Sequence, residues 1–178
     1  MSFLSKVTAR YLIMSVPDRH NSSGAWSKEE TKNSNFDPKI HKSISTEKVQ
    51  NEHGNLYLHK FHDTGRNWDY YLLSESTNPQ DHSAVITHVA GAQDLTSGKF
   101  IVDQAITRPQ WKKMGYGAFL HSLVADRHGG LLSGDSLSVG EEKLFQKLAR
   151  NPKYKVKFGE KGTTEPHILD LVTDFKKS

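Results

Sequence analysis

A seven-residue turn carries the residue types that could hold an anion. It reads Lys-Lys-Met-Gly-Tyr-Gly-Ala over residues 112–118. Gly115 and Gly117 lack a Cβ, so a ligand could approach their backbone N–H groups closely. Lys112 and Lys113 at the start of a helix would oppose the helix dipole, and a bound phosphate would offset that cost. The alternative is that the glycines only make a tight turn and the lysines form a solvated pair.

The elements on either side of the turn would position it. The apolar run at 100–106 is typical of a buried strand, and Pro109 ends it. After the turn, apolar residues recur at helical spacing, which predicts a helix whose buried stripe is Phe119, Leu120, Leu123 and Val124. The same periodicity places four polar residues on the solvated side, namely His121, Ser122, Asp126 and Arg127.

The turn resembles the acyl-CoA-binding motif of the GNAT family of N-acetyltransferases, which reads Arg or Gln, two residues, Gly, one residue, and Gly or Ala. Lys112, Gly115 and Gly117 stand at the three motif positions, with Lys where the family usually has Arg or Gln. The elements predicted downstream follow the order of the family's C-terminal half: a strand at 130–137, a helix at 139–150 that a Ser138–Glu141 capping box would begin, and strands at 154–158 and 168–172. The Ser-Gly-Asp-Ser-Leu-Ser region also resembles GNAT-like proteins encoded by bacteriophages.

The resemblance implies an α/β fold of the α+β type, with a mixed, mostly antiparallel central sheet flanked by helices. The first half departs from the family pattern, which usually has two helices between the first two strands. Here short strands are predicted at 44–50, 55–62, 68–74 and 83–90. A helix at about 2–15 and a polar loop or arm at about 17–42 would precede them. Residues 1–178 are expected to form a single domain.

Acetyl-CoA is the co-substrate that the resemblance implies, with an amine of a protein, peptide or small molecule as the acceptor. Backbone groups of Ala105, Ile106 and Thr107 would pair with the pantetheine arm. The pyrophosphate would lie on the turn, whose residues are Lys112, Lys113, Met114, Gly115, Tyr116, Gly117 and Ala118.

Under the same resemblance Asp103 is the candidate general base, acting directly or through water, although it could equally be an ordinary polar strand residue. Phe145 stands where many family members have a Tyr that protonates the leaving thiolate. Ser136, Ser138 or Tyr154 could replace it, or solvent could protonate the thiolate. The missing Tyr leaves a second function open, that of a non-catalytic GNAT-shaped binding or structural protein that engages a macromolecular partner.

Composition excludes several function classes. The 178 residues contain no Cys, which excludes disulfides, thiolate metal sites and cysteine nucleophiles. His59 and His62 are the tightest histidine pair, but residues three apart in a strand face opposite sides, so no metal site is expected. The chain also lacks a serine-hydrolase elbow and the full P-loop and dinucleotide-binding motifs.

The net charge of +4 permits contact with nucleic acid without requiring it, because the basic residues are scattered. No apolar segment reaches the length of a membrane span, and the first 15 residues are unlike a signal peptide. The sequence therefore predicts a cytoplasmic protein that makes no membrane contact, located in the host cytoplasm if a phage encodes it.

Overall fold

The computed structural model describes residues 42–134, 139–161, 163 and 165–172. The predicted helix at about 2–15 lies outside the described residues, as do Ser136 and Ser138. Of the polar segment predicted at about 17–42, only Lys42 is described, and it is the first residue of a strand.

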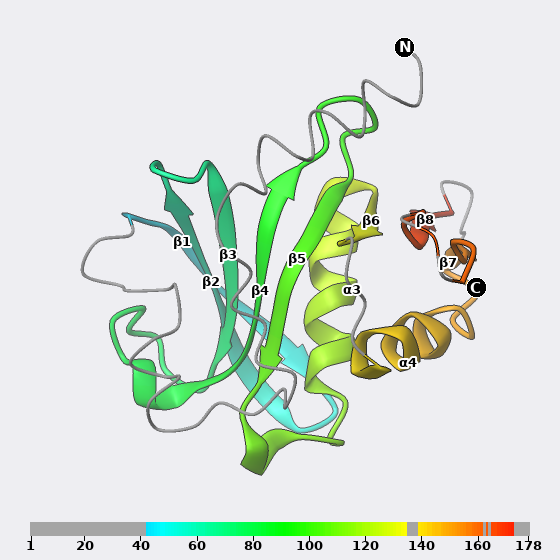
Figure 1. Ribbon diagram of the computed structural model, residues 1–178. Helices are drawn as coiled ribbons and strands as arrows, with labels where there is room; N and C mark the ends of the chain where they lie inside the picture. The colour runs from blue at the N-terminus through cyan, green and yellow to red at the C-terminus, as the bar shows by residue number, and fades with distance from the viewer. Residues whose placement is uncertain (1–41, 135–138, 162, 164, 173–178) are drawn as a thin grey trace.

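Eight strands form one sheet in the described part of the chain (Figure 1). They are β1 (Lys42–Asn51), β2 (Gly54–Asp63), β3 (Trp68–Ser74), β4 (Val85–Gln93), β5 (Phe100–Thr107), β6 (Gly130–Ser133), β7 (Tyr154–Lys157) and β8 (Ile168–Leu171). The helices are α3 (Tyr116–His128) and α4 (Val139–Leu148), with 3-10 turns η1 (His82–Ala84) and η2 (Pro109–Trp111).

The sheet is mixed and mostly antiparallel, as expected. Its strand order is β1-β2-β3-β4-β5-β6-β8-β7. Strands β1 to β5 form an antiparallel meander, and β6, β8 and β7 also pair antiparallel. The pair β5 and β6 is parallel, because α3 carries the chain back between them. The molecule is therefore an α+β protein.

The predicted strands are found at their predicted places, with shifts at their ends. Strand β3 has the predicted bounds, whereas β4 begins at Val85 because Ser83 lies in η1. The carbonyl of Ser83 accepts a hydrogen bond from Arg108, 2.8 Å away, which holds this turn beside the end of β5. Strand β6 is shorter than predicted and ends at Ser133.

Apolar side chains gather on both faces of the sheet. Tyr71 and Leu73 belong to the cluster that includes Leu120 and Val124 of α3. Tyr70 and Leu72, which alternate with them along β3, belong to a second cluster with Phe61, Val85 and Ala90. Because successive strand residues point to opposite faces, the second cluster lies on the face away from α3.

The buried side of α3 differs from the predicted stripe. Phe119 and Leu123 are only half-buried, and the buried residues are Tyr116, Leu120, His121, Val124 and Ala125. The prediction of a solvated His121 is wrong, since its side chain is 1 % exposed. The helix packs against both the sheet and α4, so it is covered over a wider arc than a single apolar stripe describes.

Among the described residues, the helices are too short and too polar to cross a bilayer.

Candidate functional site

Strand β5 has an open edge on one side. On one side, β5 pairs with β4 from one end to the other. Phe100 lies opposite Gln93, and Thr107 lies opposite Thr87. On its other side it pairs with β6 only from Phe100 to Val102. Residues 103–107 therefore have no strand partner on this side among the described residues, and we call them the open edge. An extended ligand with amide groups could pair with this backbone as a further strand would.

A bulge in β5 marks the point where the open edge begins. Gly91 pairs with Val102 and Ala90 pairs with Gln104, so Asp103 is the extra residue. A Cβ on Gly91 would lie only 1.9 Å from the carbonyl oxygen of Ile101, so this crossing requires glycine. A Cβ on Gly134, just after β6, would lie 3.5 Å from the Asp103 carboxylate. Asp103 is half-buried where β5 and β6 part.

The predicted anion turn lies at the far end of the open edge. Gly115 takes the left-handed conformation with φ of 86° as the N-cap of α3, and no side chain caps the helix there. The hydrogen bond from the N–H of Phe119 to the carbonyl of Gly115 closes the first turn. The N–H groups of residues 116–118 precede it and have no acceptor within the helix. A Cβ on Gly117 would lie 3.4 Å from Oγ1 of Thr107, which places the turn against the end of β5.

A lysine from the second helix also reaches this turn. Nζ of Lys147, in the last turn of α4, lies 3.5 Å from the position that a Cβ on Gly115 would take. Together with Lys112 and Lys113, it brings three cations to the positive end of α3. Cations at a helix N-terminus are unfavourable, and an anion bound there would offset the cost. No local pattern points to Lys147, because it lies 32 residues beyond Gly115.

His53 joins the turn from the opposite direction. It lies between β1 and β2, and its Nε2 donates a hydrogen bond to the carbonyl of Met114 over 3.2 Å. Its ring lies 5.2 Å from that of Tyr116, whose other neighbour is Trp111 at 5.6 Å. These contacts hold the turn between the β1–β2 hairpin and η2. No sequence pattern marks His53 as a site residue, because only the register of the hairpin brings it here.

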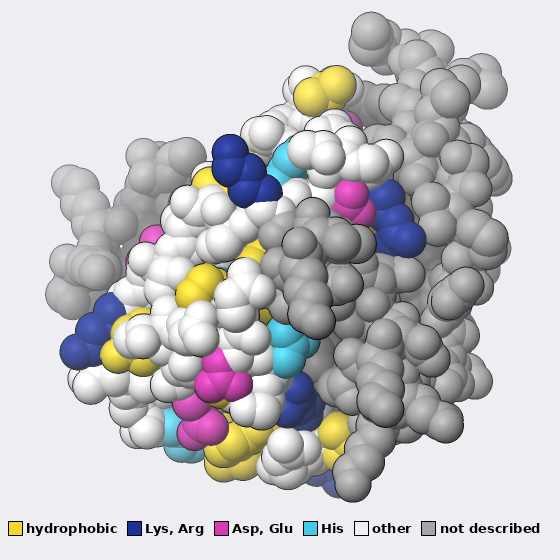
Figure 2. Space-filling view, turned by 90° about the vertical axis from the view of Figure 1, so that its left-hand side faces the viewer, with side chains coloured by type: hydrophobic (Ala, Val, Ile, Leu, Met, Phe, Trp, Pro, Cys, Tyr) yellow, Lys and Arg dark blue, Asp and Glu magenta, His cyan; other side chains and the backbone are white. Residues whose placement is uncertain are grey.

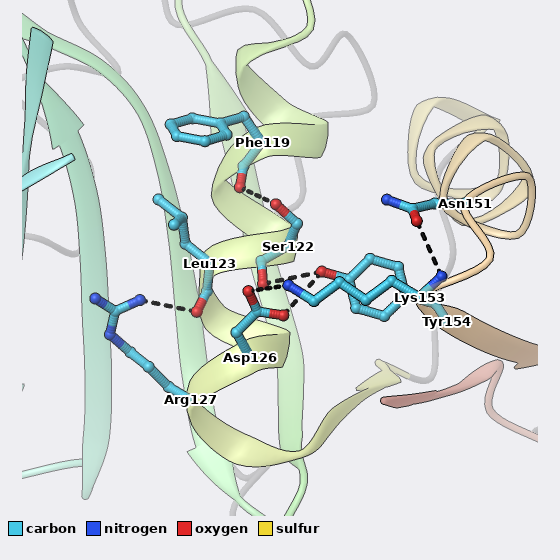
Figure 3. A network of polar contacts seen from close by, with 8 residues as sticks. All are labelled: Phe119, Ser122, Leu123, Asp126, Arg127, Asn151, Lys153 and Tyr154. Carbon is cyan, nitrogen blue, oxygen red and sulfur yellow. Dashed lines mark hydrogen bonds and ion pairs between the residues drawn. The ribbon is translucent and has the colours of Figure 1, made fainter. Parts of the chain in front are cut away.

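Tyr154 lies on a different side of α3 (Figure 3). Its hydroxyl is 3.0 Å from Oδ1 of Asp126 and 3.3 Å from the carbonyl of Ser122. Burial and the negative charge of Asp126 raise the pKa of Tyr154, so the hydroxyl holds its proton more firmly than usual. Lys153 pairs with the other carboxylate oxygen of Asp126 at 2.5 Å.

Thus the structure brings Asp103, the backbone of Ala105, Ile106 and Thr107, and the turn at 112–118 together along one strand edge. Tyr154 is held by Ser122 and Asp126 of α3, and Ser136 lies outside the described residues. Phe145 is fully buried, with its ring 5.7 Å from that of His167.

The histidine pair singled out in the sequence takes two separate sets of partners. The ring of His59 hydrogen-bonds Thr46 and the carbonyl of Ser76, at 2.8 and 2.9 Å. His62 instead pairs with Asp69 at 2.8 Å. The two rings serve different contacts across the sheet.

Charges of both signs alternate on the face seen in Figure 2, where lysine and arginine side chains stand among acidic ones and histidines. The described residues also form ion pairs between elements, including Arg127 with Glu47 and Lys60 with Asp69.

No model of a known protein family matches the chain, and no curated protein matches it either.

Proposed function

We propose that the protein is an acetyl-CoA-dependent N-acetyltransferase of the GNAT kind, which moves an acetyl group to an amine of a protein, peptide or small molecule. The observation that carries this proposal is the open edge of β5, which runs from Asp103 to a lysine-rich, glycine-capped helix start. A long ligand with a polyanionic end and an amide-containing arm is complementary to that arrangement.

The turn would hold the pyrophosphate. Its helix N–H groups point outward from the first turn of α3, and Lys112, Lys113 and Lys147 supply positive charge. The pantetheine arm would extend along the open edge, and the backbone of Ala105, Ile106 and Thr107 would exchange hydrogen bonds with its amides. This direction brings the thioester to the bulge.

The chemistry would then take place at Asp103. The amine nitrogen attacks the thioester carbonyl carbon, the C–S bond breaks, and the products are an amide and a thiol. A protonated amine must first lose one proton, and the carboxylate of Asp103 could accept it directly or through water. The attacking nitrogen loses a further proton as the amide forms, and the thiolate takes up one proton, for which Ser136, Ser138 and Tyr154 remain the candidates from the sequence, beside solvent.

Titration calorimetry with acetyl-CoA and CoA tests the proposal. We expect the wild-type protein to bind both ligands. Lys147→Glu should weaken binding about tenfold or more, because a charge-assisted hydrogen bond contributes about 1.5–3 kcal/mol. Lys155→Glu is the matched control: it makes the same charge change at an exposed position on β7 and should bind as wild type does.

Absence of binding by the wild-type protein at millimolar ligand would contradict the proposal and favour a GNAT-shaped protein without catalysis. Equal weakening by both lysine variants would show that net charge, rather than the turn, governs affinity.

A further inference from the structure

A buried histidine on α3 has an unused hydrogen-bonding atom. His121 is 1 % exposed, and its Nδ1 lies 2.7 Å from the carbonyl oxygen of Gly117. Its Nε2 is buried and has no hydrogen-bond partner among the described residues. Buried polar atoms are nearly always satisfied, so this atom points to a partner that is not part of the described chain.

The protonation state of His121 follows from its contact. A carbonyl oxygen only accepts hydrogen bonds, so Nδ1 must carry the proton. In a neutral ring Nε2 then holds a lone pair and can only accept. Burial lowers the pKa of His121 to about 4, which keeps the ring neutral near pH 7. The missing partner is therefore a hydrogen-bond donor.

The position of His121 along α3 places it behind the open edge. Gly117 stands against Thr107, and at the other end of the helix the His128 ring lies 5.0 Å from that of Phe100. The helix therefore runs antiparallel to β5. His121 lies about 6 Å along the helix from Gly117, which corresponds to about two strand residues and brings it near the level of Ala105.

The rotation of the helix turns His121 toward β6. Arg127 marks the flank of α3 that faces β1, where it pairs with Glu47. Tyr154 of β7 contacts α3 on another flank, at Ser122 and Asp126 (Figure 3). At about 100° per residue, Arg127 lies about 80° from Gly117 in one direction, and His121 lies about 40° from it in the other direction, toward the flank of Ser122. His121 therefore faces the strip between β5 and β6, where the strands part.

We propose that Nε2 of His121 accepts a hydrogen bond from an amide N–H of the pantetheine arm of an acyl-CoA that lies along the open edge. This inference rests on the proposed function. The thioester and the ionised phosphates carry no donor, whereas the pantetheine arm carries two amide N–H groups. His121 is thus a binding residue for the pantetheine arm, whereas the turn at 112–118 binds the phosphates.

Calorimetry with two ligands tests the inference. CoA contains the arm, and adenosine 3′,5′-bisphosphate lacks it. We expect His121→Leu to weaken CoA binding about three- to tenfold, as loss of one neutral hydrogen bond does, and to leave bisphosphate binding unchanged. His59→Leu is the matched control, because His59 is equally buried but lies on β2, where its ring hydrogen-bonds Thr46 and the carbonyl of Ser76. It should leave both affinities unchanged.

Unchanged CoA affinity of His121→Leu, or equal loss for both ligands, would overturn the inference while leaving the proposed function intact. If the wild-type protein binds neither ligand, the proposed function fails and this inference fails with it.

A measurement on the wild-type protein keeps the test independent of any variant's folding. In ¹⁵N spectra of the histidine rings, Nε2 of His121 should move from the position of a free acceptor to that of a hydrogen-bonded one when CoA is added. The bisphosphate should leave it in place. If the chemical shift of Nε2 does not change at saturating CoA, the inference is refuted.

Discussion

At the scale of single residues, two buried histidines tie stability to pH. His88 and His121 are both buried away from solvent, which lowers the pKa of each to about 4 from an ordinary value of 6.5. In the unfolded chain they would take up protons at a higher pH than in the folded protein. Stability is therefore complete above about pH 6.5 and falls as the pH drops toward 4.

We expect the unfolding free energy to fall by about 2 kcal/mol for each of these histidines when the pH drops from about 7 to about 5. Urea unfolding at the two pH values measures the loss. His121→Leu should lose about 2 kcal/mol less than wild type over that interval, because it removes one of the two groups. An equal loss of unfolding free energy in both proteins would mean that the pKa of His121 is the same in the folded and unfolded states.

At the scale of elements, Tyr154 fastens β7 to α3 through the carboxylate of Asp126. Tyr154→Phe removes this hydrogen bond and keeps the ring, so we expect a loss of about 1 kcal/mol in unfolding free energy. Lys153→Met should cost less, because its ion pair with Asp126 is partly exposed and such pairs contribute about 0–1 kcal/mol. Denaturant unfolding of both variants measures the difference.

The same variant addresses the catalytic prediction for Tyr154. A firmly held proton and a carboxylate partner suit an anchoring group. Once an acceptor amine is known, the kcat of Tyr154→Phe distinguishes the two roles. An unchanged kcat with lowered stability agrees with an anchoring role. A large fall in kcat would support Tyr154 as the acid that protonates the thiolate.

At the scale of the whole molecule, the sheet carries an apolar cluster on each face. Leu120 of α3 is buried in one cluster and Phe61 of β2 in the other, both with no exposed side-chain area. Leu120→Ala should cost about 2–5 kcal/mol and Phe61→Ala about 3–5 kcal/mol, through lost burial and the cavity left behind. We expect each variant to unfold in one transition, because the same strands carry both clusters. Two separate calorimetric transitions in either variant would contradict a single cooperative core.

Local sequence patterns are enough to predict the strands, the helices and the turn. Alternating and helical apolar periodicity predicted the eight strands, α3 and α4, and the glycine and lysine residue types predicted the turn at 112–118. Such signals depend on neighbouring residues, so they can be read along the chain. The tertiary structure alone decided three features of the site: the open edge of β5, the approach of Lys147 and His53 to the turn, and the burial of His121. Each depends on strand register or on the packing of α4 against α3, which join residues far apart in sequence and leave no local pattern.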